Sequence, residues 1–189
     1  MTMSRSLRSL FAALMLVALT AHAAPAAGDV PPDYVGKLID GTAVKVSDYA
    51  GKAVVLSFWA TWCPYCLKEL PILNAIQNSA AKGGIEVIAV NTEARDVFRG
   101  ASRALSKVIN IRMAYDPDHL AQSAYGVNGI PHMVIIGKDG KIIRVYRGYA
   151  ESSLGKIVDD INQATGASAP SSKRAQAQQI AEPHAKIAD

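Results

Sequence analysis

Residues 58–66 read Phe-Trp-Ala-Thr-Trp-Cys-Pro-Tyr-Cys and contain both cysteines of the chain. A nearly continuous apolar run, residues 53–58, leads into this stretch and is typical of a strand that is covered on both faces. Apolar residues at helical spacing follow, and they predict a helix over residues 63–79 that contains Pro71. The cysteine pair is therefore predicted to lie where a buried strand passes into a helix.

Strand and helix patterns alternate through the rest of the chain. Further strands are predicted over residues 85–90, 111–115, 133–136 and 141–146. Further helices are predicted where Phe98, Ala101, Leu105 and Val108 repeat at helical spacing, over residues 119–125, and along the apolar stripe Leu154, Ile157, Val158 and Ile161. Asp40-Gly41 and Asp139-Gly140 indicate β-hairpins. Right-handed β-α-β crossovers give a parallel sheet with helices on both faces, and the second hairpin adds an antiparallel edge. The predicted fold class is α/β.

The two ends of the chain differ from this middle part. Residues 1–23 combine early arginines, an apolar stretch and the small-x-small site Ala21-His22-Ala23, which predicts a cleaved secretory signal. The apolar stretch is shorter than the roughly 20 residues of a membrane-spanning helix, and an uncleaved N-terminal anchor is the alternative. Residues 166–189 are rich in small and polar residues, which predicts a disordered tail. The predicted domain spans residues 24–165.

The composition restricts the classes of function. Of 189 residues, 20 are Lys or Arg and 16 are Asp or Glu, and the basic residues are scattered, which argues against a nucleic-acid partner. The sequence has neither a nucleotide phosphate-binding loop nor a dinucleotide fingerprint. Two cysteines make neither a disulfide-dense scaffold nor a four-cysteine zinc site, and no histidine shows a paired ligand spacing. We therefore expect an exported domain with no metal and no organic cofactor.

The C-x-x-C spacing at a strand–helix junction favours a redox-active disulfide. The unpaired N–H groups and partial positive charge of a helix N-terminus stabilise a thiolate, so Cys63 is predicted to be the nucleophile. Pro64 suits the first helical turn, where its missing N–H costs nothing. Cys66 lies on the same helix face, where the two Cα atoms are about 5–6 Å apart. So short a loop constrains the unfolded chain little, which makes reactivity a better explanation of the bond than stabilisation.

Residues 58–66, followed by Glu69, resemble the active-site segment of thioredoxin-fold proteins, most closely the exported TlpA/ResA-like thiol–disulfide reductases. Gly129-Ile130-Pro131 resembles the cis-proline loop of that family, and Asp139-Gly140 falls where its terminal hairpin lies. The resemblance covers roughly residues 30–165. It implies a three-layer α/β/α sandwich with a mixed sheet and an N-terminal β-hairpin extension.

The resemblance also implies an activity, a location and partners. The protein is expected to be a monomeric periplasmic oxidoreductase that reduces disulfides of other proteins, with electrons from a membrane thiol transporter. Apocytochrome c and other secreted thiol proteins are the implied substrates. Cys63 attacks the substrate disulfide and Cys66 resolves the mixed disulfide.

Glu69 matches a glutamate of the ResA-like motif and is predicted to accept the proton that Cys66 loses during resolution. Burial would raise its pKa, whereas a solvated glutamate beside Lys68 is the alternative. Ser57 stands at the strand position where thioredoxin carries a buried acid, which leaves Glu69 as the candidate acceptor.

Substrate contacts are predicted on two segments. Trp62, Pro64 and Tyr65 are candidates for a rim around the nucleophile that binds a polypeptide, while Trp59 is assigned to the core. A cis bond before Pro131 would turn the backbone of Ile130 toward a bound peptide, which can pair with it as an added strand. His132, after the cis-proline, either tunes the thiolate or is uninvolved.

The remaining alternatives differ in reaction or in class. Pro64-Tyr65 is the dipeptide of glutaredoxins, and it leaves open an oxidase or isomerase. A glutathione-dependent reductase would have a Gly-Gly element after Pro131, which is absent. A peroxidase would have proline and threonine at the positions of Leu56 and Ala60. A copper carrier, which is not an enzyme, would have C-x-x-x-C and a well-placed histidine.

Overall fold

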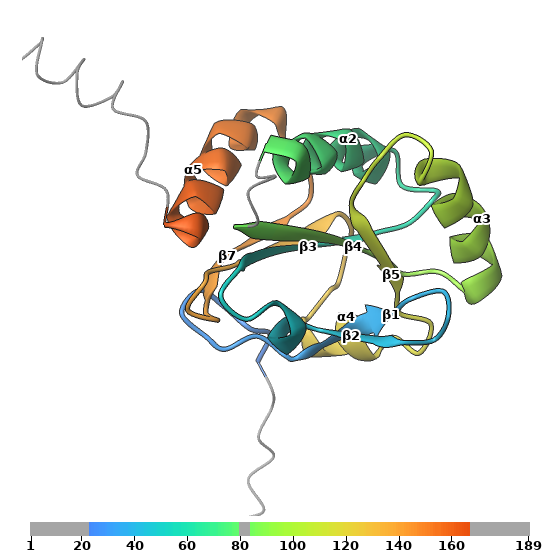
Figure 1. The fold of residues 1–189 in the computed structure, drawn as a ribbon, viewed down its shortest axis with the longest axis horizontal. Helices are drawn as coiled ribbons and strands as arrows, with labels where there is room; N and C mark the ends of the chain where they lie inside the picture. Colours follow the sequence, from blue (N-terminus) through green and yellow to red (C-terminus); the bar gives the residue numbers. More distant parts are fainter. Residues whose placement is uncertain (1–22, 80–83, 167–189) are drawn as a thin grey trace, which may run out of the picture.

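A computed structural model describes residues 23–79 and 84–166 and shows a sheet between two layers of helices (Figure 1). The strands are β1 (Tyr34–Lys37), β2 (Ala43–Lys45), β3 (Ala53–Trp59), β4 (Ile85–Asn91), β5 (Arg112–Tyr115), β6 (His132–Ile136) and β7 (Ile142–Arg147). The helices are α2 (Pro64–Ser79), α3 (Arg95–Leu105), α4 (Leu120–Ala124) and α5 (Leu154–Thr165), with the 3-10 turns η1 (Val46–Tyr49) and η2 (Glu151–Ser153). This order confirms the predicted three-layer α/β/α sandwich.

The sheet is mixed and runs in the order β2-β1-β5-β4-β3-β6-β7. Strands β3, β4 and β5 are parallel, whereas β6 and β7 add the predicted antiparallel edge. The two hairpins expected at Asp40-Gly41 and Asp139-Gly140 join β1 to β2 and β6 to β7. All seven residues of β3 are buried, as its continuous apolar run predicts. The N-terminal hairpin extends the sheet beyond β5, so the expected extension is confirmed.

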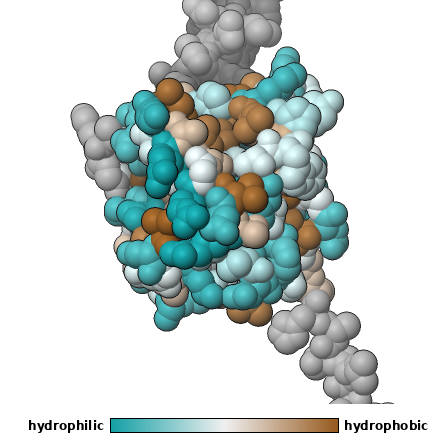
Figure 2. Space-filling view, turned by 90° about the vertical axis from the view of Figure 1, so that its right-hand side faces the viewer, coloured by the Kyte–Doolittle hydropathy of each residue, from teal (hydrophilic) through white to brown (hydrophobic). Residues whose placement is uncertain are grey.

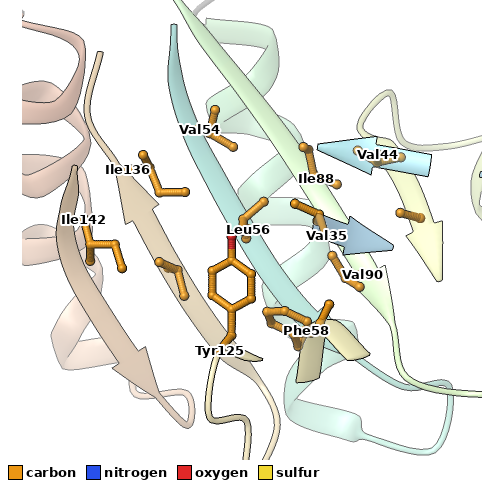
Figure 3. Packing of buried hydrophobic residues seen from close by; sticks show 13 residues of the cluster. Val35, Val44, Val54, Leu56, Phe58, Ile88, Val90, Tyr125, Ile136 and Ile142 are labelled. Carbon is orange, nitrogen blue, oxygen red and sulfur yellow. The ribbon is translucent and has the colours of Figure 1, made fainter. Parts of the chain in front are cut away.

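Side chains of β3 alternate between two cores because successive residues of a strand point to opposite faces. Val54, Leu56 and Phe58 pack with Tyr125 on the side of α4, where the Phe58 and Tyr125 rings lie 5.6 Å apart (Figure 3). On the other face, the remaining β3 residues meet α2 and α5, which cover that side of the sheet in Figure 1. Each large apolar side chain buried in this way stabilises the fold by roughly 1.5–3 kcal/mol.

Two valines do not lie on the inward faces that their spacing indicates. Val108 is 73 % exposed because α3 ends at Leu105, after which the chain continues in turns. Val158 is exposed because the adjacent Ile157 takes the inward position of α5, and neighbouring helical residues are about 100° apart. The helix prediction is therefore wrong at Val108, and the apolar stripe of α5 is narrower than its sequence indicates.

The described ranges leave out the segments that carry the predicted signal (residues 1–23, except Ala23), the tail (residues 166–189, except Gly166) and most of the predicted helix end at Lys82-Gly83-Gly84. Among the helices of residues 23–79 and 84–166, none has both the length and the apolar character needed to cross a bilayer.

Figure 2 looks onto the side where α3 lies in Figure 1. That side is mainly hydrophilic, with apolar residues singly or in small groups, and offers no broad apolar surface.

Candidate active site

Cys63 lies immediately before the first residue of α2, in the position that caps a helix. Its carbonyl oxygen accepts the N–H of Leu67, and its Sγ accepts the N–H of Cys66 at 3.2 Å. Bonding from the cap side chain to the third helical N–H is the usual capping pattern, with sulfur in place of oxygen. The same N–H group and the positive end of the helix stabilise negative charge on this sulfur. The predicted position of Cys63 at a helix N-terminus is confirmed.

Cys63 and Cys66 form a disulfide, and their Cα atoms are 5.3 Å apart, within the predicted range. Cys63 is 3 % exposed and Cys66 1 % exposed. Both sulfurs pack in a small core with Trp59, which is buried as predicted, and with Leu70 of α2. The structure therefore holds the oxidised state, and a substrate reaches Cys63 only by contacting the surface around it.

The loop before β6 faces the disulfide. The bond between Ile130 and Pro131 is cis, as predicted, and the carbonyl oxygen of Ile130 lies 3.8 Å from the Sγ of Cys63. The carbonyl oxygen of Pro131 accepts the N–H of Gly148 at 2.8 Å, which ties the loop to the end of β7. The backbone of Ile130 thus lies beside the nucleophile, where a peptide would meet both.

The three predicted rim residues lie on the surface next to the disulfide. Trp62 is 69 % exposed, Tyr65 is 56 % exposed, and Pro64 is exposed. The Tyr65 ring stacks on Tyr149 with centroids 6.3 Å apart, and the Lys68 ammonium lies 5.8 Å from the Tyr65 centroid. Contact of this rim with a substrate stays a prediction. The sequence pattern missed Tyr149 because it comes from the loop after β7, far along the chain.

A polar anchor that the sequence reasoning also missed holds the loop between β3 and α2. The N–H and hydroxyl of Thr61 donate to the Glu93 carboxylate at 2.6 and 2.8 Å, and the amide of Asn91 donates to it at 3.1 Å. Glu93 follows β4, which runs parallel to β3, so both loops lie at the same edge of the sheet. Polar residues just after adjacent parallel strands are the signal that would have found this anchor.

Glu69 lies inside the protein and not in solvent beside Lys68. It is 4 % exposed, and its Oε1 accepts a hydrogen bond of 2.5 Å from the Ser57 hydroxyl. Burial raises the pKa of Glu69 from 4.5 to about 7, and the hydrogen bond from Ser57 opposes that rise. Near neutral pH this carboxyl group can therefore either accept or release a proton.

A cavity of about 150 Å³ lies next to Glu69, between α2 and the segment that joins β7 to α5. Its lining residues are Glu69, Tyr146, Arg147, Gly148, Tyr149, Ala150, Ser153 and Ile157. Glu69 thus borders a cavity that neither cysteine lines.

His132 lies on the other side of the sheet from Glu69. Its ring packs edge-on against Phe58, with centroids 6.0 Å apart, on the face of α4. Burial, together with the smaller effect of the nearby charge of Arg147, lowers the pKa of His132 to about 4, so the ring is neutral near pH 7. Cys66 packs on the opposite face, and of the two roles considered for His132 the structure favours the uninvolved one.

Within residues 23–79 and 84–166, no three side chains of His, Cys, Asp or Glu are grouped closely enough to hold a metal ion. The chemistry that the arrangement offers is that of the sulfur pair and the adjacent carboxyl group. Thiol–disulfide exchange requires an attacking thiolate and, in a dithiol protein, a second cysteine to resolve the mixed disulfide. The site supplies both cysteines and, one turn after Cys66, a carboxyl group that can exchange a proton.

Comparison with known proteins gives concordant matches. The profile of the Redoxin family matches residues 26–164. The thiol-disulfide oxidoreductase ResA of Geobacillus thermodenitrificans is 33 % identical over 131 residues, which are 68 % of this chain and 74 % of that protein. ResA of Bacillus subtilis is 30 % identical over 128 residues, or 67 % and 70 % of the two chains.

A crystal structure from Chlorobium tepidum, provisionally described as the thiol:disulfide interchange protein DsbE, superimposes with a TM-score of 0.66 at 28 % identity. The match covers 76 % of this chain and all of that one. The family match over residues 26–164 includes the sheet, almost all of the helices around it and the segment with the two cysteines.

Proposed function

The chain belongs to the Redoxin family and is a ResA-like thiol–disulfide oxidoreductase, and on this premise we propose that it reduces disulfides of other proteins outside the cytosol. The observation that carries the proposal is the position of Cys63. Its sulfur caps α2, accepts a backbone N–H and lies 3.8 Å from the carbonyl oxygen of Ile130, beside the cis-proline. A stabilised thiolate next to a backbone that can pair with a peptide suits attack on a protein disulfide.

The reaction begins with the reduced protein. The Cys63 thiolate attacks one sulfur of the substrate disulfide, forms a mixed disulfide and releases the other substrate sulfur as a thiolate, which takes up a proton. Cys66 then loses its proton to Glu69, and its thiolate attacks the Sγ of Cys63. The second substrate sulfur leaves as a thiolate, which takes up a proton, and the Cys63–Cys66 disulfide forms. Two electrons have passed from the protein dithiol to the substrate.

The location and the partners rest on the sequence. The leader predicted over residues 1–23 and the TlpA/ResA resemblance support export to the periplasm. A membrane protein that transports thiol electrons would return the Cys63–Cys66 disulfide to the dithiol after each turnover. Proteins with cysteine pairs, including apocytochrome c during cytochrome maturation, are the proposed substrates, and the protein would act as a monomer.

A direct test is to mix the reduced protein with a disulfide-bonded test protein such as insulin and to count thiols by alkylation and mass measurement. We expect insulin thiols to appear at the rate at which Cys63 and Cys66 are oxidised. The reciprocal mixture, oxidised protein with reduced insulin, should react less completely. Preferential transfer of the disulfide to the substrate would overturn the reducing direction and support the oxidase alternative.

Replacing Glu69 by glutamine is expected to slow resolution of the mixed disulfide and to change its pH dependence. The wild-type rate should rise as the pH passes through about 7, because the ionised carboxylate is the form that accepts a proton. Glutamine accepts no proton in this range, so that rise should be absent. The measurement is the rate of resolution, by rapid acid quenching, between pH 5 and 9.

Stability gives a second measurement on the same variant. The folded pKa of Glu69 is raised above the ordinary 4.5, so its stabilising effect is complete below about pH 4.5 and is lost as the pH rises through about 7. Glu69→Gln should remove that loss, whereas Glu151→Gln, at an exposed site, should keep the wild-type dependence of stability on pH.

The rate measurement decides the catalytic role. If the rate of resolution depends on pH in the same way in Glu69→Gln as in the wild type, Glu69 is not the proton acceptor.

A further inference from the structure

We propose that Ser57 is a positioning residue for the proton transfer, in which its hydroxyl group holds the Glu69 carboxyl group ready to accept the proton of Cys66. The inference rests on the proposed function, because it concerns the resolving step. It begins from a contact within the core: the Ser57 Oγ and the Glu69 Oε1 are 2.5 Å apart, and both residues are buried.

Ser57 is a rigid anchor for such a contact. It lies on β3, where it pairs with Ala89 of β4 on one side and with Met133 of β6 on the other. Glu69 comes from α2, three residues after Cys66, so the two side chains lie on the same side of the helix. The hydroxyl therefore ties one carboxyl oxygen to the centre of the sheet and limits the orientations of the other.

Other groups near Glu69 give no equivalent contact. The titratable or charged groups that share its cavity are Tyr146 and Arg147 of β7 and Tyr149 of the loop after β7, and Cys66 lies one turn earlier on α2. The Tyr146 hydroxyl donates to Asp160 of α5. Within the described ranges, Ser57 is the one residue that hydrogen-bonds to the Glu69 side chain. Its loss would leave a buried carboxylate without a donor, a state that is strongly disfavoured.

The arrangement explains how a carboxyl group so deeply buried can still ionise. Donation from Ser57 stabilises the carboxylate form and lowers the pKa of Glu69 against the larger, opposite effect of burial. Glu69 also lines the cavity of about 150 Å³, space for a few water molecules at roughly 30 Å³ each. A proton taken from Cys66 can pass on through this cavity while Ser57 keeps the carboxyl group in place.

The proposal is tested by replacing Ser57 and following two measurements. In Ser57→Ala, carbon NMR of the glutamate carboxyl groups, assigned with Glu69→Gln, should show the pKa of Glu69 raised by about one unit. The ionised fraction at pH 7 would then fall from about one half to about one tenth. Resolution of the mixed disulfide should therefore slow about fivefold at pH 7 and approach the wild-type rate at high pH.

Ser57→Thr and Ser57→Val form a matched pair of nearly equal shape that suits a strand, and only the threonine keeps the hydroxyl. Threonine should keep the wild-type pH profile and valine should shift it, which separates the hydrogen bond from packing even if the alanine variant folds poorly. If Ser57→Thr and Ser57→Val had the same pKa at Glu69 and the same pH dependence of resolution, the proposed role of Ser57 would be overturned. A wild-type protein that reduces no disulfide would overturn the proposed function instead.

Discussion

Replacing Cys63 by serine is expected to abolish disulfide reduction, whereas replacing Cys66 by serine should leave the protein joined to its substrates by a stable mixed disulfide. The sulfur of Cys63 caps α2 and lies beside the cis-proline loop, so the first bond to a substrate forms there. Cys66 lies in the first turn of α2, buried and within disulfide distance of Cys63, so its thiolate is placed to attack the Sγ of Cys63. Without that attack, the mixed disulfide has no internal route to break.

Gel separation without reductant measures both outcomes. Cys66→Ser should give a band of higher mass that disappears with dithiothreitol, and Cys63→Ser should give none. Alkylation of the reduced wild-type protein by iodoacetamide at neutral pH provides an independent check, because the more stabilised thiolate reacts first. Faster modification of Cys66 than of Cys63, or a trapped complex only in Cys63→Ser, would reverse the roles assigned to the two sulfurs.

Elements of the fold were predictable from the sequence wherever one short stretch carries a strong signal for a strand or a turn. The run at residues 53–58 has no polar interruption larger than serine, and the structure buries every residue of β3. Asp40-Gly41 and Asp139-Gly140 mark turns by their backbone preferences, and both hairpins form. Val108 shows the limit of such patterns: a helical spacing continues past the residue where the chain leaves α3, and the sequence has no marker of that end.

In the site, too, some residues were predictable from nearby sequence and others depend on how distant segments pack. Cys63 is predictable because the strand–helix junction, Pro64 and the cysteine spacing all lie within a few residues of one another. Whether Glu69 is buried depends on how α2 rotates against β3, and its contact with Ser57 exists only after the helix packs on the sheet. The stacking of Tyr65 on Tyr149 depends equally on the path of β7. These contacts join segments that are distant in sequence, and neither residue of such a pair indicates the other.

The disulfide is expected to be reducing on the scale of known oxidoreductases, with a midpoint more negative than roughly −200 mV. On that scale thioredoxin lies near −270 mV, glutaredoxins at about −200 to −230 mV, and the oxidase DsbA near −120 mV. Because 30 mV is about 1.4 kcal/mol for a two-electron couple, these classes differ by several kcal/mol. The TlpA/ResA resemblance favours the reducing end, and the glutaredoxin-like Pro64-Tyr65 pair favours the middle of the range.

The surroundings of Cys63 support a value away from the oxidase end, because a strong oxidant owes its potential to a highly stabilised reduced form. The Cys63 sulfur accepts one backbone N–H from Cys66, but the carbonyl oxygen of Ile130 at 3.8 Å disfavours negative charge on it. The neutral ring of His132 lies on the other face of the sheet and adds no positive charge. Equilibration with glutathione buffers, followed by thiol trapping, measures the midpoint. A midpoint near −120 mV, together with a dithiol form that resists denaturant better than the disulfide form, would contradict this prediction. The Cys63 thiolate would then be far more stabilised than these contacts allow, and the protein would be an oxidase.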